Sequence, residues 1–166
     1  MLSLYSGFIN NLEAENHLTC CITVVCNVEK FYYFSCMDYI PTFEKGKRFN
    51  DDYYDFIKAL GIELEKEGYI KHYIQDKWMY IFSGLETFEG EETFEWLKAK
   101  NHCIYLIDSL VEDKIILGGL ENKIDSKIER FFKIKNVAQT RYSYYPNKPK
   151  SSEQIDYIIL RVLNSL

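Results

Sequence analysis

Five side chains are the best candidates for acid–base or nucleophilic chemistry in this sequence: Asp52, His72, His102, Cys103 and Asp108. Histidine exchanges protons near neutral pH, but a catalytic histidine needs a second group held within hydrogen-bond reach. No motif in the sequence ties members of this set together in that way. Ordinary surface or half-buried side chains are therefore the favoured interpretation. An enzyme whose site is assembled from these distant residues is the alternative.

Motifs of the common nucleotide-dependent and hydrolytic enzymes do not occur. The sequence has neither the phosphate-binding pattern G-x-x-x-x-G-K-[ST] nor the dinucleotide-binding pattern G-x-G-x-x-G. The hydrolase patterns G-x-S-x-G and H-E-x-x-H are also missing. We therefore expect neither an enzymatic activity nor a bound cofactor.

The cysteines indicate reduced thiols. There are five, an odd number, and none belongs to a C-x-x-C pair. Zinc held by His17, Cys20, Cys21 and Cys26 is a conceivable site, but structural zinc sites use ligand pairs at C-x₂₋₄-C spacing. Adjacent Cys20 and Cys21 would also point to opposite faces of a strand. We expect no metal site.

The cytoplasm is the predicted location. No apolar stretch approaches the ~20 residues that a membrane-spanning helix needs. The stretch 1–17 has no Lys or Arg before its apolar residues and no small-residue cleavage site, so it does not resemble a secretory signal.

Charge is distributed unevenly along the chain. Residues 1–121 contain 11 basic and 21 acidic side chains, a net charge of −10, whereas residues 122–166 contain nine basic and four acidic ones, a net charge of +5. The whole chain therefore has a net charge of −5. Such an asymmetry is informative about partners and not about fold.

The acidic pole is the stretch 84–96, GLETFEGEETFEW, which has five glutamates and no Lys or Arg. Aromatic rings interleaved with carboxylates suit docking onto a basic protein, because the rings supply contact area and the charge raises the association rate. The predicted partner-binding residues are Glu86, Phe88, Glu89, Glu91, Glu92 and Glu95.

The basic pole is the stretch 130–150, in which no acidic residue occurs. Basic groups alternating with aromatic rings are what single-stranded nucleic acid binding requires. The predicted secondary surface consists of Arg141, Tyr142, Tyr144, Tyr145 and Lys148. A solvated loop, or one lying against the acidic segment 50–67 of the same chain, is the competing interpretation.

These features favour a small acidic cytoplasmic protein that binds and neutralises a basic protein partner. The bacterial immunity proteins that inhibit nuclease toxins have this general character, a likeness of type that no residue motif carries. The predicted partner is a basic toxin domain; a nucleic acid or a membrane is not expected. The alternatives are the enzyme described above and a nucleic-acid-binding accessory protein that acts through 130–150.

Apolar periodicity predicts helices over 2–14, 50–67, 92–100, 122–134 and 151–166. The clearest is 50–67, whose apolar residues recur at helical spacing: Tyr53, Phe56, Ile57, Leu60 and Leu64. Gly61 in its interior costs up to ~1 kcal/mol relative to alanine. A kink or a close packing partner is therefore expected at Gly61.

Runs rich in β-branched and aromatic residues predict three strand pairs: 17–28 with 31–37, 69–75 with 77–84, and 102–110 with 114–120. Loops are expected at 39–49 and 137–152. Because the strands arrive as hairpins, we predict a single α+β domain over 1–166, with a mostly antiparallel sheet and helices packed on one face.

Overall fold

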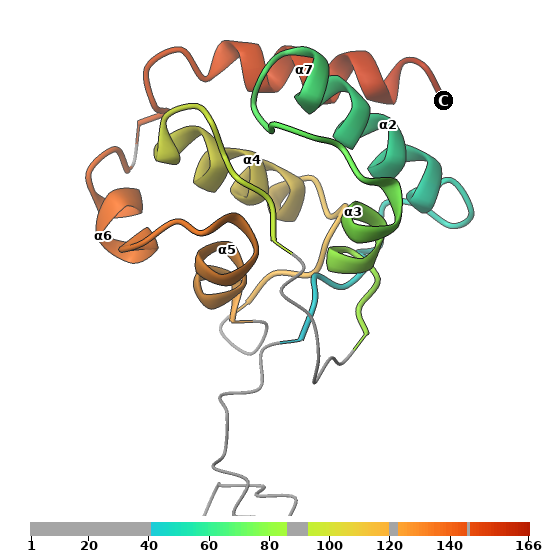
Figure 1. Cartoon of the computed structure of the whole chain (residues 1–166), viewed down its shortest axis with the longest axis horizontal. Coiled ribbons are helices and arrows are strands. Elements are labelled where there is room, and N and C mark those ends of the chain that lie inside the picture. Colours follow the sequence, from blue (N-terminus) through green and yellow to red (C-terminus); the bar gives the residue numbers. More distant parts are fainter. Residues whose placement is uncertain (1–40, 86–92, 120–122, 146) are drawn as a thin grey trace, which may run out of the picture. The chain divides into compact units, whose positions relative to one another are not determined.

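Helices build the part of the chain that the computed structural model describes, which comprises residues 41–85, 93–119, 123–145 and 147–166. They are α2 (Tyr53–Lys66), α3 (Gln75–Ile81), α4 (Lys100–Glu112), α5 (Ile124–Phe132), α6 (Val137–Tyr142) and α7 (Glu153–Leu163). Helix α4 packs against α5, α6 and α7, while α2 packs against α3 and α7 (Figure 1). Within the described residues, α4 is therefore the element around which the others assemble.

The predicted antiparallel sheet is wrong for the described residues. They contain no strand, and their only sheet-like pairings are two isolated antiparallel bridges, Lys45 with Ile116 and Ile70 with Trp96. Each bridge ties a connecting segment to another one far away in the sequence. The fold of this part of the chain is therefore helical, not α+β.

Two predicted strands are helices. The segment 77–84 overlaps α3, where Trp78 and Ile81 lie on the buried face three residues apart. The segment 102–110 lies inside α4, whose buried residues are Cys103, Ile104, Leu106, Ile107 and Leu110. A run that is apolar on several sides looks the same whether it is a buried strand or a buried helix, because periodicity alone does not separate the two.

The other predicted strands of the described region contribute one bridge residue each, Ile70 from 69–75 and Ile116 from 114–120. The pair 17–28 with 31–37 and the helix 2–14 lie outside the described residues. The single domain over 1–166 consequently stays a prediction.

Three predicted helices are confirmed: α2 within 50–67, α5 within 122–134 and α7 within 151–166. Two other predictions were wrong. Residues 93–99 of the predicted helix 92–100 are irregular, and α4 begins only at Lys100. The predicted loop 137–152 contains α6, a helix of six residues.

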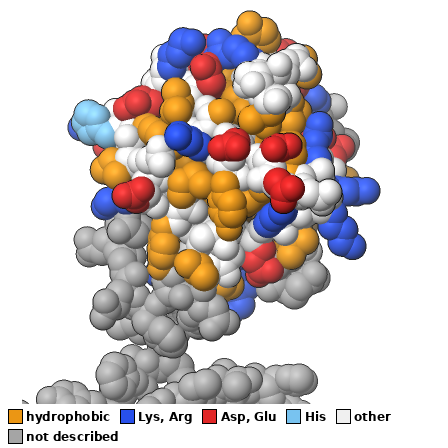
Figure 2. Space-filling view, turned by 90° about the vertical axis from the view of Figure 1, so that its right-hand side faces the viewer, with side chains coloured by type: hydrophobic (Ala, Val, Ile, Leu, Met, Phe, Trp, Pro, Cys, Tyr) orange, Lys and Arg blue, Asp and Glu red, His pale blue; other side chains and the backbone are white. Residues whose placement is uncertain are grey.

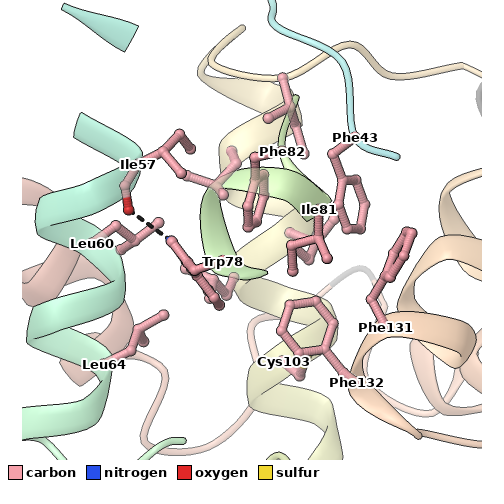
Figure 3. Close-up of a cluster of buried hydrophobic side chains, with 14 of the residues drawn as sticks. Phe43, Ile57, Leu60, Leu64, Trp78, Ile81, Phe82, Cys103, Phe131 and Phe132 are labelled. Carbon is pink, nitrogen blue, oxygen red and sulfur yellow. Dashed lines mark hydrogen bonds between the residues drawn. The ribbon is translucent and has the colours of Figure 1, made fainter. Parts of the chain in front are cut away.

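Aromatic side chains fill the core between α2, α3 and α5. The indole Nε1 of Trp78 donates a hydrogen bond to the carbonyl oxygen of Ile57 in α2 at 2.7 Å (Figure 3). The Trp78 ring packs edge-on against Phe94, with 5.3 Å between ring centroids, and Phe43 stacks on Phe82 at 5.1 Å. Because α3 has only seven residues, too few for a stable isolated helix, these contacts must hold it in place.

Gly61 has the close packing partner that the sequence predicts. A Cβ atom at this position would lie 2.3 Å from Cε2 of Tyr73 and 2.8 Å from Nε1 of Trp78. The missing side chain lets the α3 region approach α2 at the point where Trp78 makes its hydrogen bond. Glycine therefore contributes to packing here, despite its low helix propensity.

One lysine lies on the buried face of α5. Lys127 is fully buried next to Ile128 and Phe131, and its ammonium has no hydrogen-bond partner among the described residues. Its Nζ lies 5.8 Å from the centroid of the Phe43 ring, a cation–π contact. Burial lowers the pKa of Lys127, and the nearby Glu44 carboxylate partly opposes this shift.

Candidate functional site: a lysine-lined groove

The segment that leads into α4 forms one wall of a groove. Its backbone is fixed at both ends, because Phe94 N–H donates to the carbonyl of Phe131 at 2.7 Å and Leu97 N–H donates to the carbonyl of Tyr69 at 2.8 Å. Trp96 lies between these two bonds, and its Nε1 donates to the carbonyl of Ala99 at 3.1 Å. The irregular stretch 93–99 is thereby a fixed platform.

The connection between α5 and α6 forms the other wall. Lys133, which ends α5, and Asn136, which precedes α6, both have left-handed backbone conformations, with φ of 54° and 61°. Two such residues turn the chain sharply within four positions. Ile134 between them is buried, and Glu129 accepts a hydrogen bond from Val137 N–H at 3.1 Å, which fixes the start of α6.

The two walls enclose a groove of about 650 Å³. Both segments can be followed in Figure 1, as the stretch before α4 and the connection from α5 to α6. Its floor is apolar, with the half-buried Trp96 and the buried Phe132 and Ile134. Its polar lining consists of Glu95, Lys98, Lys100, Lys133, Lys135 and Asn136.

Four lysines and one glutamate give the groove a local net charge of +3 in a chain whose total is −5. All four lysines are exposed, and within the described part of the chain none is in an ion pair. Lys98 alone has a partner there, with its Nζ 5.4 Å from the centroid of the Tyr69 ring. Like charges gathered without counterions repel one another.

Helix α4 starts in this groove with a sequence unfavourable for a helix N-terminus. Lys100 is its first residue, its first turn has no acidic side chain, and no side chain caps it. A helix N-terminus carries partial positive charge, so a cation there opposes the helix dipole. The positive charge of the groove thus lowers stability locally, and an anion bound there would relieve it.

A different face of the molecule has mixed charge. Figure 2, which looks at the α2 and α3 side of Figure 1, shows basic and acidic side chains interspersed with hydrophobic ones. Interspersed charges largely cancel at a distance, whereas the groove concentrates one sign.

The predicted acidic partner-binding surface is described at one residue only. Glu86, Phe88, Glu89, Glu91 and Glu92 lie outside the described residues. Glu95 is exposed and lies in the groove beside the four lysines. This glutamate therefore belongs to a surface of net positive charge.

Arg141 of the predicted basic surface pairs inside the molecule. Its Nε and Nη2 donate to the two carboxylate oxygens of Asp108 in α4 at 2.8 and 2.7 Å, and its Nη1 donates to Asp125 in α5. These hydrogen bonds raise the pKa of Arg141 further. The hydroxyl of Tyr144 also donates to Asp108, at 3.3 Å. Arg141 and Tyr144 therefore hold α6 against α4 and α5.

Lys148 is also paired, at the opposite end of the predicted basic surface. Its Nζ donates to Asp156 of α7 at 2.8 Å and lies 5.4 Å from the centroid of the Tyr105 ring. The Tyr105 hydroxyl donates to the other oxygen of Asp156 at 2.7 Å. Lys148, Tyr142 and Tyr145 are the exposed members of the predicted surface, whereas Arg141 and Tyr144 are half-buried.

The structure does not assemble the candidate catalytic residues. Cys103 is fully buried, and burial raises the pKa of its thiol, which makes it a poor nucleophile. Asp108 is engaged by Arg141, and the Nε2 of His102 is 2.9 Å from the carbonyl oxygen of Lys150. Asp52 and His72 are exposed, and no described hydrogen bond or ion pair joins two members of this set.

Sequence reasoning found half of the groove. Lys133 and Lys135 belong to the basic stretch 130–150, whereas Lys98 precedes α4 and Lys100 is its first residue, outside both predicted poles. The alternation LKAK at 97–100 was the available signal. This alternation belongs to the end of the predicted helix 92–100. Nothing in these four residues indicates that they face residues more than 30 positions later in the chain.

Metal and membrane functions receive no support from the described residues. Among them, no group of three or more His, Cys, Asp or Glu side chains could hold a metal ion. None of the helices in the described ranges is long and apolar enough to span a bilayer. The cytoplasmic location and the predicted partners stay predictions.

Comparison with known proteins gives no further lead. No protein-family model matches the sequence, and no curated protein or solved structure is detectably similar to it. The chemistry of the site therefore has to be inferred from its own residues.

Proposed function

We propose that this chain binds a phosphate-bearing polymer, a nucleic acid strand, in the lysine-lined groove. The observation that carries the proposal is the convergence of Lys98, Lys100, Lys133 and Lys135 on one groove, without an ion pair among the described residues. Lysines contact phosphates as point charges, and most protein–nucleic acid hydrogen bonds go to the backbone.

The exposure of the lysines favours a polymer over a small phosphorylated molecule. Sites for small ligands enclose most of the ligand and use a few fixed polar groups. Here all four lysines are exposed to solvent, and they line a groove whose floor is apolar. Exposed lysine side chains along a groove can contact successive phosphates of a nucleic acid backbone. Each contact releases counterions from the nucleic acid, and this release supplies binding free energy.

The test compares two double charge reversals. In Lys133→Glu/Lys135→Glu the reversed residues line the groove, whereas in Lys58→Glu/Lys71→Glu they are exposed and lie outside it. Each Lys→Glu change alters the charge by −2, so both variants change the net charge from −5 to −9. Fluorescence anisotropy with a labelled oligothymidylate of about 12 nucleotides, a typical site length, measures affinity at low salt.

We expect the groove variant to lose about tenfold or more in affinity, because two phosphate contacts become repulsive. The control variant should change by only about twofold, since neither of its lysines lines the groove and exposed charges are screened by salt. Circular dichroism would verify that both variants fold. Equal losses in the two variants, or no binding by the unaltered protein, would contradict the proposal.

Neutralisation of a basic protein is the second candidate function. The observation that favours it is the run of five glutamates between 86 and 95 without a lysine or arginine. If it holds, Glu89→Lys/Glu91→Lys/Glu92→Lys should abolish capture of a basic partner, such as a toxin domain, in co-expression. Undiminished capture by the charge-reversed protein would remove the acidic segment from this function.

A further inference from the structure

Two tyrosine rings beside the groove are exposed to a degree unusual for aromatic side chains. Tyr142 is 82% exposed and Tyr145 is 73% exposed. Neither ring contacts another aromatic ring or a cation among the described residues. Tyr142 ends α6, in which Val137 and Thr140 are buried and Arg141 is paired with Asp108, whereas Tyr145 follows α6 in a turn.

These rings follow directly from the groove along the chain. Helix α6 begins one residue after Asn136, which lines the groove, and Tyr142 is its last residue. At 1.5 Å per residue, the six steps from Asn136 to Tyr142 cover about 9 Å. That is the length of about three stacked nucleotides at ~3.4 Å each. Tyr142 is therefore within reach of a strand that extends about three nucleotides beyond Asn136.

Arg141 fixes α6, whose last residue is Tyr142 and which is followed by the turn that contains Tyr145. Its paired hydrogen bonds to Asp108 and its bond to Asp125 attach α6 to both α4 and α5. An aromatic ring on a fixed element loses little entropy when a base stacks on it, because a tyrosine has only two rotatable side-chain bonds. Arg141 is a positioning residue in this arrangement.

We infer that the groove takes a single strand, whose phosphates contact the lysines while its bases stack on Tyr142 and Tyr145. This inference rests on the function proposed above and adds the strandedness of the ligand and the residues that select it. In a duplex the base faces are already stacked on one another, so exposed rings gain nothing from it. In a single strand every base offers a face, and stacking is tolerant of sequence.

The experiment uses three ligands of equal length and label: oligothymidylate, the same backbone without bases, and a duplex. The variant is Tyr142→Ala/Tyr145→Ala, and the matched control is Tyr54→Ala/Tyr157→Ala, which removes two rings that are 50% and 59% exposed on α2 and α7. Affinities are measured in the full chain at one salt concentration.

The unaltered protein should bind oligothymidylate about tenfold or more tightly than the baseless strand, at about 1.4 kcal/mol per factor of ten. The Tyr142→Ala/Tyr145→Ala variant should lose that advantage and keep its affinity for the baseless strand, while the control keeps both. Equal affinity of the unaltered protein for the three ligands, or an equal loss in both tyrosine variants, would overturn the stacking inference and leave the lysine groove standing. Absence of binding to all three would overturn both.

Discussion

The ammonium group of Lys127 has apolar surroundings, which disfavour its charged form. Lys127 lies on the apolar face of α5, fully buried and without a hydrogen-bond acceptor among the described residues, where the Phe43 ring and the charge of Glu44 favour the ammonium. An unsatisfied buried polar group costs about 1–3 kcal/mol, and a charged one costs more. This residue is consequently a source of instability in the folded chain.

Lys127→Met should raise the free energy of unfolding by about 1–3 kcal/mol near pH 7, because methionine fills similar volume without a charge. The pKa of Lys127 is lowered in the folded state, so the penalty is fully present below that pKa and fades as pH rises toward the unfolded value of ~10.4. Denaturant unfolding of both proteins from about pH 7 to pH 10 checks this. The advantage of the variant should shrink as pH increases, and a constant advantage would contradict the assignment.

Lys133 combines a groove charge with an unfavourable backbone conformation. Its φ of 54° lies in the left-handed region, which costs a residue with a side chain about 1–2 kcal/mol relative to glycine. Left-handed residues at the end of a helix are usually glycine. Lysine at this position therefore adds positive charge to the groove at a cost in backbone stability.

Lys133→Gly should separate these two effects. We expect the free energy of unfolding to increase by about 0.5–1 kcal/mol, because glycine adopts this conformation without strain. Affinity for oligothymidylate should fall at the same time by about threefold to tenfold. Thermal unfolding and anisotropy on the same samples measure both quantities. A variant that is more stable and binds equally well would remove Lys133 from the site.

Helix α2 depends on the absence of a side chain at Gly61. Alanine normally stabilises a helix interior by up to ~1 kcal/mol relative to glycine. Here its Cβ would overlap Tyr73 and the Trp78 indole, so Gly61→Ala should lower the free energy of unfolding by about 1–3 kcal/mol. Urea denaturation provides the value. A stabilised variant would show that the contact between α2 and the α3 region is looser than described.

Helix α6 depends on Arg141. Arg141→Lys keeps the positive charge but loses the bidentate contact with Asp108. We expect the free energy of unfolding to fall by about 1 kcal/mol, a modest amount because the ion pair is partly exposed. Arg48→Lys is a suitable control, since Arg48 makes a single surface pair with Asp113. Hydrogen exchange should become faster at α6 amides in the first variant only. Unchanged α6 protection would mean that other contacts fix this helix.

The sequence predicts some helices and not others for a physical reason. Helices α2, α5 and α7 each bury one stripe and expose the opposite face, so their spacing is distinctive. Helix α4 buries Cys103, Leu106, Ile107 and Leu110 at helical spacing, but the run 103–107 is apolar without interruption, which also fits a buried strand. Helix α3 has only seven residues and is held by the hydrogen bond from Trp78 to Ile57. Helix propensities of single residues do not include such a tertiary contact.

The candidate site was predictable only in part, because its residues come together through long-range contacts. Arg141 looked like a free surface cation, yet its partner Asp108 lies 33 positions earlier in the sequence. Tyr142 and Tyr145 are exposed, and their role in binding stays a prediction. Charge patterns in a sequence thus identify which groups are present, whereas the fold decides which of them are neutralised.

At the scale of the whole molecule, an overall acidic chain is proposed to bind a polyanion. Its net charge of −5 should repel a nucleic acid strand at long range, whereas the local charge of +3 in the groove attracts it at short range. Attraction of this kind acts within about one Debye length, ~10 Å at 0.1 M salt. Binding should therefore be local, and strongly dependent on the lysines of the groove.

The dependence of oligothymidylate affinity on salt concentration tests this most directly. Four lysine–phosphate contacts to a single strand predict that log K falls with log[salt] with a slope of about −3, at ~0.7 per contact. Lys133→Glu/Lys135→Glu should reduce the slope to about −1.5, while Lys58→Glu/Lys71→Glu should leave it near the value of the unaltered protein. A slope near zero, or the same reduction in both variants, would show that the lysine-lined groove does not bind phosphate.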